Sequence, residues 1–232
     1  MIEVSPATSR GGLCYFSEEF LAMPVDALMK EERLFSVEQG RLLLDWIRGQ
    51  ADESRSVYPF LTTLAELALR PSEARTVRVR DVVLLNEGWG ELTVRRGGAR
   101  RGIPLQPHFV DFLGGWISEA GLREGDLMFP SMNGGPLSVS VYQRLWRQVQ
   151  EAVLPCGDRC IQYTGEPVSI LRDSRIAAWL KLGISPFAIA EWADVSASWL
   201  AVRYPYCFGM QDAEIDWDHL AEVMALPDLA EP

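Results

Sequence analysis

The sequence predicts a mainly α-helical fold with one small three-stranded antiparallel sheet, an α+β arrangement. Apolar residues recur at helical spacing through most of residues 36–208. Between Val77 and Leu105 the apolar period shortens to roughly two, the period of a half-buried strand. The turn signals Asn86-Glu87-Gly88 and Gly97-Gly98 divide this stretch into three strands.

Helices are expected before the sheet. Ser36 can cap a first helix because Gln39 occupies the third following position, the pattern of a capping box. A second helix is expected over residues 58–69, and it ends near Arg70-Pro71 because proline disfavours helical geometry in the residue before it. A short helix restarts over residues 71–73.

The sheet and the helices after it follow from the same periodicities. Strands are expected over residues 77–85, 91–95 and 102–105. Gly183 is expected to end one of the later helices, and Pro186 to begin another. These later helices are expected over residues 109–119, 138–153, 171–182, 187–193 and 196–204.

The two ends of the chain differ from its middle. Residues 1–35 have weak periodicity, so we treat them as an N-terminal extension with a short helix around residues 18–28. Residues 36–208 form the main domain, and residues 209–232 form an acidic C-terminal tail. Apolar residues of this tail approximate one helical face: Ile215, Leu220, Val223 and Met224.

The net charge of −10 argues against a nucleic-acid partner, because phosphate binding needs lysine and arginine. The acidity is concentrated at the ends, however. Residues 207–232 carry a net charge of −7, whereas residues 61–110 carry +3. The charge distribution therefore leaves the arginine-rich middle available to an anionic partner.

No metal or other cofactor is predicted. Cys156 and Cys160 have a spacing that could hold a metal, but His108 and His219 lie far away in sequence and no second close pair completes four ligands. Four cysteines in a chain of this size do not form a disulfide framework.

No association with a membrane is predicted. No apolar run approaches the roughly 20 residues that span a bilayer. The N-terminus, interrupted by Glu3, Pro6 and Arg10, has no apolar stretch typical of a signal peptide. We therefore expect a cytoplasmic protein.

Two arginine-bearing segments and one tyrosine carry a family resemblance. Residues 69–74 (LRPSEA) precede Val79-Arg80-Asp81-Val82, and residues 169–174 (SILRDS) contain Arg172, with Tyr204 32 residues after it. Together with the three strands and residues 127–130 (LMFP), their order and spacing resemble the catalytic domain of the tyrosine recombinase (phage integrase) family over about residues 36–208.

The resemblance implies phosphoryl transfer without a metal. Arg70 and Arg172 would hold the non-bridging phosphate oxygens, since a guanidinium group forms two parallel charge-assisted hydrogen bonds. Tyr204 would attack in line and form a phosphotyrosyl link, with Tyr206 as the alternative nucleophile. Without the resemblance, Arg70 would be read as an ordinary helix-end arginine and both tyrosines as core aromatics.

The sequence departs from the family at its proton-transfer groups. Ser169 stands where the family usually has a histidine, and Val195 stands where it usually has histidine or tryptophan. The two lysines, Lys30 and Lys181, lie outside the turn between the second and third strands, where the family has a general-acid lysine. That turn carries arginines instead, and arginine is a poor proton donor because its pKa exceeds about 12. We therefore expect strand cleavage to be slow or absent.

The implied partner is double-stranded DNA, in site-specific DNA recombination and DNA integration. Arg95, Arg96, Arg100 and Arg101 are the expected DNA-binding residues of the hairpin. Glu73 is expected either to orient a neighbouring basic group or to be an ordinary first-turn glutamate. Alternatives are a catalytically inactive module of this fold that binds DNA or a protein partner, and an unrelated α+β protein.

The resemblance also bears on the acidic tail, because the family often donates its last helix to a neighbouring subunit. The tail of this chain would then make a homo-oligomer. It could equally fold back over the basic sheet of its own subunit, or simply keep the protein soluble.

Overall fold

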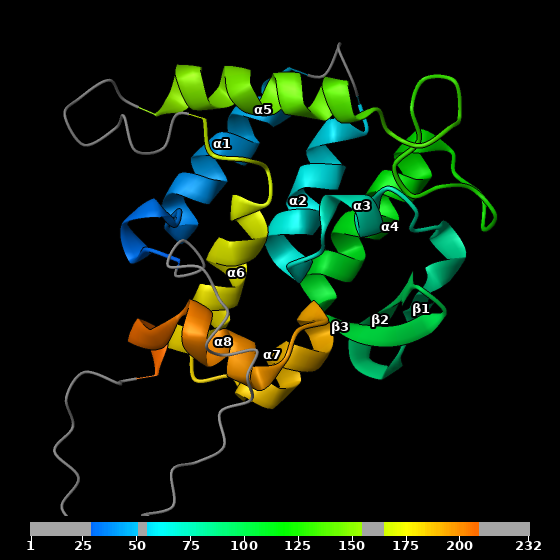
Figure 1. The fold of residues 1–232 in the computed structure, drawn as a ribbon. Helices are drawn as coiled ribbons and strands as arrows, with labels where there is room; N and C mark the ends of the chain where they lie inside the picture. Colours follow the sequence, from blue (N-terminus) through cyan, green and yellow to red (C-terminus); the bar gives the residue numbers. More distant parts are fainter. Residues whose placement is uncertain (1–28, 51–54, 155–164, 209–232) are drawn as a thin grey trace, which may run out of the picture.

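Helices form most of the part of the chain that the computed structural model describes, residues 29–50, 55–154 and 165–208 (Figure 1). The predicted fold class is confirmed: these ranges contain eight α-helices and one three-stranded antiparallel sheet. The elements in chain order are α1 (Val37–Gly49), α2 (Val57–Leu67), α3 (Pro71–Ala74), β1 (Val82–Leu84), β2 (Gly90–Arg96), β3 (Ala99–Leu105), α4 (Pro107–Ala120), α5 (Val139–Val153), α6 (Ile170–Lys181), α7 (Pro186–Ala193) and α8 (Ala197–Arg203).

The helix α2 forms the centre of the core. Phe60, Leu61 and Leu64 on this helix are fully buried, because its apolar residues face the helices packed on both sides. It contacts α6 and α1, and α1 contacts α5, which lies across one end of the molecule (Figure 1). The predicted capping box is present at the start of α1, where the Ser36 hydroxyl accepts from the Gln39 N–H and the Gln39 side chain accepts from the Ser36 N–H.

The sheet has the strand order β1-β2-β3, with both pairs antiparallel. On its inner face, Leu92, Val94, Ile103 and Leu105 are buried. The predicted first strand, residues 77–85, is wrong in its first half. The Asp81 carboxylate accepts from the Arg78 N–H, and this local bond folds Val79–Asp81 into a 3-10 turn before β1 begins.

The chain preceding Ser36 packs against the main body. Met29, Leu34 and Phe35 are buried, and the Arg33 guanidinium donates to both carboxylate oxygens of Glu166 at 2.8 Å. The packed body therefore begins before residue 36. The helix expected over residues 18–28, the acidic tail, and the pair Cys156 and Cys160 lie outside the described residues.

The last three helices bring one turn toward the sheet. The helix α6 ends before Gly183, which has a positive φ of 77°, as its expected role in ending the helix requires. Pro186 occupies the first turn of α7, and Asp194 ends α7 in the left-handed conformation, with φ of 53°. The Ser196 hydroxyl accepts from the Trp199 N–H and caps α8. The turn at residues 193–195 therefore faces the β2–β3 hairpin.

Candidate functional site: an arginine cleft

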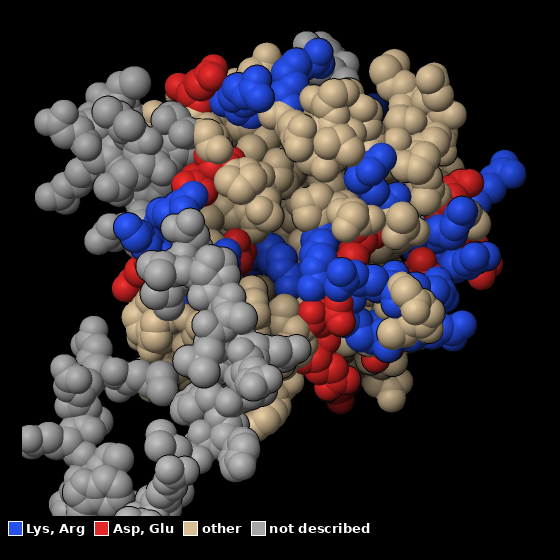
Figure 2. All heavy atoms as spheres, viewed as in Figure 1, with Lys and Arg blue, Asp and Glu red and all other residues tan. Residues whose placement is uncertain are grey.

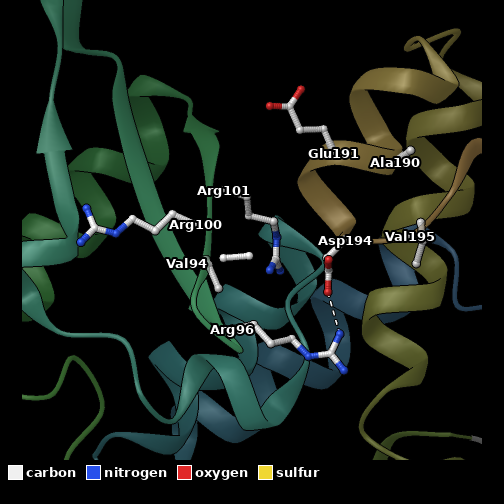
Figure 3. Close-up of a pocket in the computed structure, with 9 residues that line it drawn as sticks. Val94, Arg96, Arg100, Arg101, Ala190, Glu191, Asp194 and Val195 are labelled. Atoms are coloured by element: carbon white, nitrogen blue, oxygen red, sulfur yellow. Dashed lines mark hydrogen bonds and ion pairs between the residues drawn. The ribbon is translucent and has the colours of Figure 1, made fainter.

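A cleft of about 350 Å³ lies between the β2–β3 hairpin and the end of α7 (Figure 3). Arg96 and Arg101 line it from the hairpin, and Asp194 lines it from the helix end. Arg70, the residue before α3, reaches the same Asp194 side chain. We name this group, consisting of Arg70, Arg96 and Arg101 with the carboxylates Glu73 and Asp194, the arginine cleft. Figure 2 shows basic side chains gathered over the sheet side of the molecule, with acidic side chains among them.

Arg70 is held by two carboxylates. Its Nη1 donates to Glu73 Oε1 at 3.0 Å and to Asp194 Oδ2 at 2.8 Å, and its Nη2 donates to the Asp194 carbonyl oxygen at 2.9 Å. A quarter of its side chain, 25%, remains exposed. Arg70 therefore joins the start of α3 to the end of α7 and stays open to solvent.

Glu73 fixes the basic groups around it. It is buried, and it accepts from the Arg70 N–H at 2.9 Å, from Arg70 Nη1, and from Arg101 Nη2 at 2.9 Å. Burial by itself raises the pKa of Glu73, but hydrogen bonds from Arg101 and Arg70 and their positive charges outweigh burial, so the pKa falls below its ordinary value. Of the two roles expected for Glu73, the orienting one is confirmed, and it coexists with a place in the first turn of α3.

Asp194 places a carboxylate oxygen between two guanidinium groups. Its Oδ2 accepts from Arg70 Nη1 at 2.8 Å and from Arg96 Nη1 at 2.6 Å, and 42% of its side chain is exposed. Partial burial raises the pKa of Asp194, but the hydrogen bonds from Arg96 and Arg70 lower it further than burial raises it. Asp194 is therefore an anion that three arginines surround, since Arg101 also lowers its pKa by charge.

Strand alternation divides the four hairpin arginines between two faces. Residues 94, 96, 99 and 101 share one face, because Val94 pairs with Arg101 and Arg96 with Ala99 in the antiparallel register. Arg96 and Arg101 therefore point into the cleft, and Arg100 points away from it (Figure 3). Arg95 lies opposite Arg100 on the other face and forms an ion pair with the buried Asp81. Three of the four predicted DNA-binding arginines therefore line the cleft, and two of them, Arg96 and Arg101, direct their side chains into it.

Arg172 lies deeper than Arg70. Its Nη1 donates to the Ala68 carbonyl oxygen at 2.5 Å, and its Nη2 donates to the Ala193 carbonyl oxygen at 2.7 Å. These oxygens belong to the C-terminal ends of α2 and α7, which carry partial negative charge. Burial and then the nearby positive charge of Arg70 lower the pKa of Arg172 to about 10, so it stays protonated at neutral pH. Arg70 and Arg172 thus bind adjacent carbonyl oxygens of one turn, those of Asp194 and Ala193.

Tyr204 is fully buried, at 0% exposure. Its hydroxyl donates to Asp173 Oδ1 at 2.6 Å, and Asp173 directly follows Arg172 on α6. Burial first and then the Asp173 carboxylate raise the pKa of Tyr204 far above its ordinary value. The phenol therefore lies near Arg172 in the fold, yet it is buried in the core and away from solvent.

Tyr206, the alternative nucleophile, is half-buried within the 3-10 turn Pro205–Cys207. Its hydroxyl is buried and has no hydrogen-bond partner among the described residues. Burial raises the pKa of Tyr206 above its ordinary value. Neither tyrosine hydroxyl therefore faces the arginine cleft with an ionised or exposed oxygen.

The positions of the replaced proton-transfer groups are half-buried. Ser169 precedes α6, and Val195 lines the cleft beside Asp194. The nearby tryptophans pack against other aromatic side chains: Trp192 forms an edge contact with Trp179, and Trp199 forms one with Tyr204. The described residues contain no group of three potential metal ligands.

Sequence reasoning missed two carboxylates. Asp194 directly precedes Val195, and Asp173 directly follows Arg172, so both adjoin positions that the resemblance singled out. The available signal was their charge next to a predicted phosphate site. Within the described ranges, no helix has both the length and the apolar character needed to cross a bilayer.

Comparison with known proteins gives matches in structure alone. Neither a family model nor a curated protein sequence matches this chain. The crystal structure of XerH site-specific recombinase bound to palindromic difH substrate, a post-cleavage complex, matches 84% of this chain with a TM-score of 0.62 and 16% identity. XerA recombinase matches 84% of it with a TM-score of 0.56 and 17% identity.

The integrase of transposon Tn1549, in complex with circular intermediate DNA, matches 75% of the chain with a TM-score of 0.57 and 15% identity. The chain spans 53% of the XerH chain, 66% of the XerA chain and 63% of the Tn1549 integrase chain. The structural neighbours agree with the resemblance predicted from residues 69–74, 169–174 and Tyr204. The described residues of this chain therefore adopt the fold of the tyrosine recombinase catalytic domain.

Proposed function

We propose that this protein binds double-stranded DNA as an integrase-fold protein of site-specific recombination, and that its strand cleavage through Tyr204 is slow or absent. The observation that carries the proposal is the convergence of four arginines on one turn. Arg70 and Arg172 bind neighbouring carbonyl oxygens at residues 193–194, and Arg96 and Arg101 approach from the hairpin.

Arginines in this arrangement suit a phosphodiester. A guanidinium group presents several N–H donors in a fixed plane, so two or three of them around one point can hold the non-bridging oxygens of a phosphate. Their charge would also stabilise the additional negative charge of a pentavalent transition state. The named neighbours XerH and Tn1549 integrase are bound to DNA in their structures, which supports DNA as the partner of the same fold here.

Three features support impaired cleavage. Tyr204 is buried and its hydroxyl donates a hydrogen bond to Asp173, so it must leave the core before it can attack a phosphorus atom. Ser169 and Val195 cannot transfer a proton at neutral pH, and the hairpin offers arginine in place of a lysine. Each general acid or base contributes about 10²- to 10⁴-fold to a rate, so the loss of several slows cleavage strongly.

The test is duplex DNA binding by the full chain, measured by fluorescence anisotropy over a series of salt concentrations. Arg96→Gln removes a cleft arginine whose side chain is 58% exposed, so the variant is expected to fold normally. Because each phosphate contact releases counterions, this change should weaken binding and reduce the slope of log Kd against log salt by about one.

Arg41→Gln is the matched control. Arg41 lies on α1, its side chain is 81% exposed, and its substitution removes the same charge outside the cleft. It should leave the salt slope unchanged. Binding that does not depend on salt, or equal effects of the two substitutions, would overturn the proposed DNA interface.

The second candidate is a module that has lost catalysis entirely and uses the fold to bind DNA or a protein partner. The burial of Tyr204 favours this second candidate, because the Tyr204 hydroxyl already has a hydrogen-bond acceptor, Asp173, inside the core. A nicked suicide duplex, which traps a phosphotyrosyl link, distinguishes slow cleavage from none.

A further inference from the structure

We propose that Asp194 acts as a built-in substitute for phosphate in the arginine cleft, and that a DNA phosphate must displace its carboxylate from Arg70 and Arg96 in order to bind. This inference rests on the proposed function and adds to it a contact that limits DNA affinity. In the structure, the anion between Arg70 and Arg96 is the Asp194 carboxylate, a side chain of the protein itself.

The contacts of the Asp194 carboxylate resemble those of a bound anion. A single oxygen, Oδ2, accepts from Arg70 Nη1 at 2.8 Å and from Arg96 Nη1 at 2.6 Å. These two donors come from different parts of the chain, 124 and 98 residues away from Asp194. A non-bridging phosphate oxygen would take the same two donors at the same distances, because charge-assisted N–H···O bonds to carboxylate and phosphate are alike in length.

The backbone conformation indicates that the side chain matters at this position. Asp194 has a φ of 53°, which glycine adopts freely and other residues seldom do. A glycine would end α7 without cost, whereas aspartate adds the carboxylate that Arg70 and Arg96 bind. The Asp194 carbonyl oxygen also accepts from Arg70 Nη2, so the backbone and the side chain hold the same arginine.

Exposure makes displacement feasible. The Asp194 side chain is 42% exposed and that of Arg96 is 58% exposed, so an incoming anion reaches both from solvent. Ion pairs at this level of exposure are weak, because water screens them and both side chains must be ordered. A DNA phosphate, supported by neighbouring phosphates along the duplex, can therefore compete with the carboxylate.

Asp194→Asn tests the inference on the full chain. Asparagine has nearly the same shape and tolerates the left-handed conformation, so it removes the charge and keeps the turn. Loss of two partly exposed ion pairs should tighten duplex binding about tenfold at low salt. The slope of log Kd against log salt should change little, because in both proteins the bound duplex contacts the same two arginines.

Glu191→Gln is the matched control. Glu191 is an exposed acid of α7 that also lines the cleft, and its side chain points away from the arginines (Figure 3). The control removes one negative charge from the same surface without touching Arg70 or Arg96. Duplex affinity should change less than about twofold, as expected for a long-range effect between exposed charges. An equal gain for the two variants would show a general charge effect and overturn the inference.

A second probe separates the inference from the proposed function. Inorganic phosphate, followed through the Nε–H resonances of the arginines, should bind the Asp194→Asn protein more tightly than the unaltered protein. If phosphate binds more tightly to the Asp194→Asn protein but neither protein binds duplex DNA, the proposed DNA function fails and the role of Asp194 as a substitute for phosphate is supported. If the unaltered protein and the Asp194→Asn protein bind duplex DNA with equal affinity and phosphate with equal affinity, the inference about Asp194 fails and the proposed DNA function is retained. Should Asp194→Asn unfold at a lower temperature, Asp194→Gly, which suits the same φ, serves as the second variant.

Discussion

The arginine cleft and the buried first turn of α6 contain the same kinds of groups in opposite environments. In the cleft, Arg70 is 25% exposed and binds the buried Glu73 and the partly exposed Asp194. In the first turn of α6, Arg172 binds two helix-end carbonyl oxygens, and the buried Tyr204 hydroxyl donates to Asp173. Under the proposed function, this difference separates phosphate binding from tyrosine attack. The exposed cleft would serve the first, whereas the burial of Tyr204 would prevent the second.

The largest expected effect is at Arg172. Arg172→Ala removes two charge-assisted hydrogen bonds and leaves the Ala68 and Ala193 carbonyl oxygens without this donor. The free energy of unfolding should fall by about 4 kcal/mol, because each such bond contributes about 1.5–3 kcal/mol. Urea unfolding followed by circular dichroism measures it. A loss below about 1 kcal/mol would mean that Arg172 is not a structural link between α2 and α7.

Glu73 should give the next largest effect. Glu73→Gln keeps the shape of the side chain but removes the buried charge that Arg70 and Arg101 contact. We expect the free energy of unfolding to fall by about 3 kcal/mol at neutral pH, the lower end of the cost when a buried pair loses one partner, because Arg70 is partly exposed. Thermal or urea unfolding measures the change, and an unchanged midpoint would contradict this role.

Stability should also depend on pH through Glu73. Its pKa in the folded protein is below its ordinary value of 4.5, so its charge stabilises the fold above that ordinary value. This stabilisation is lost as pH falls from 4.5 through the lower folded pKa. The Glu73→Gln protein should show a shallower loss over the same range, and a residual slope should remain because the pKa of Asp194 is lowered too. Equal slopes in both proteins would refute the assignment.

The two tyrosines should give the smallest effects and should differ from each other. Tyr204→Phe removes a buried hydrogen bond to Asp173 and should lower the free energy of unfolding by about 1.5–2 kcal/mol. Tyr206→Phe removes a buried hydroxyl that has no partner among the described residues, so stability should change by less than about 0.5 kcal/mol or rise. Urea unfolding of both variants side by side is the measurement. A larger loss of stability for Tyr206→Phe than for Tyr204→Phe would contradict the assignment of Tyr204 as the buried tyrosine whose hydroxyl is hydrogen-bonded.

Local patterns in the sequence were sufficient to predict most of the fold. The capping box at Ser36, the glycine turn at Gly97-Gly98 and the proline that begins α7 act over a few residues, so they can be identified without tertiary structure. The strand expected to begin at Val77 begins later, because the Asp81 side chain accepts a hydrogen bond from the Arg78 N–H. Apolar periodicity does not reveal such a side-chain contact.

The site was less predictable, for a physical reason. Spacing placed Arg70, Arg172 and Tyr204 in one region of the fold, but it does not determine which way a side chain points or what neutralises it. The direction of Tyr204 depends on Asp173, and the state of Arg70 and Arg96 depends on Asp194. These contacts join residues 31, 124 and 98 positions apart, so they exist only after the chain has folded.

The most direct test of the central claim uses a nicked suicide duplex with the full chain and with Tyr204→Phe. Each reaction is divided between a native gel, which reports binding, and a denaturing gel, which reports a covalent link. We expect the native gel to show salt-sensitive complexes for both proteins, and the denaturing gel to show little or no adduct for either. A rapidly formed adduct that Tyr204→Phe abolishes would contradict the proposal that burial of Tyr204 prevents cleavage. The lack of any complex would contradict the arginine cleft as a DNA interface.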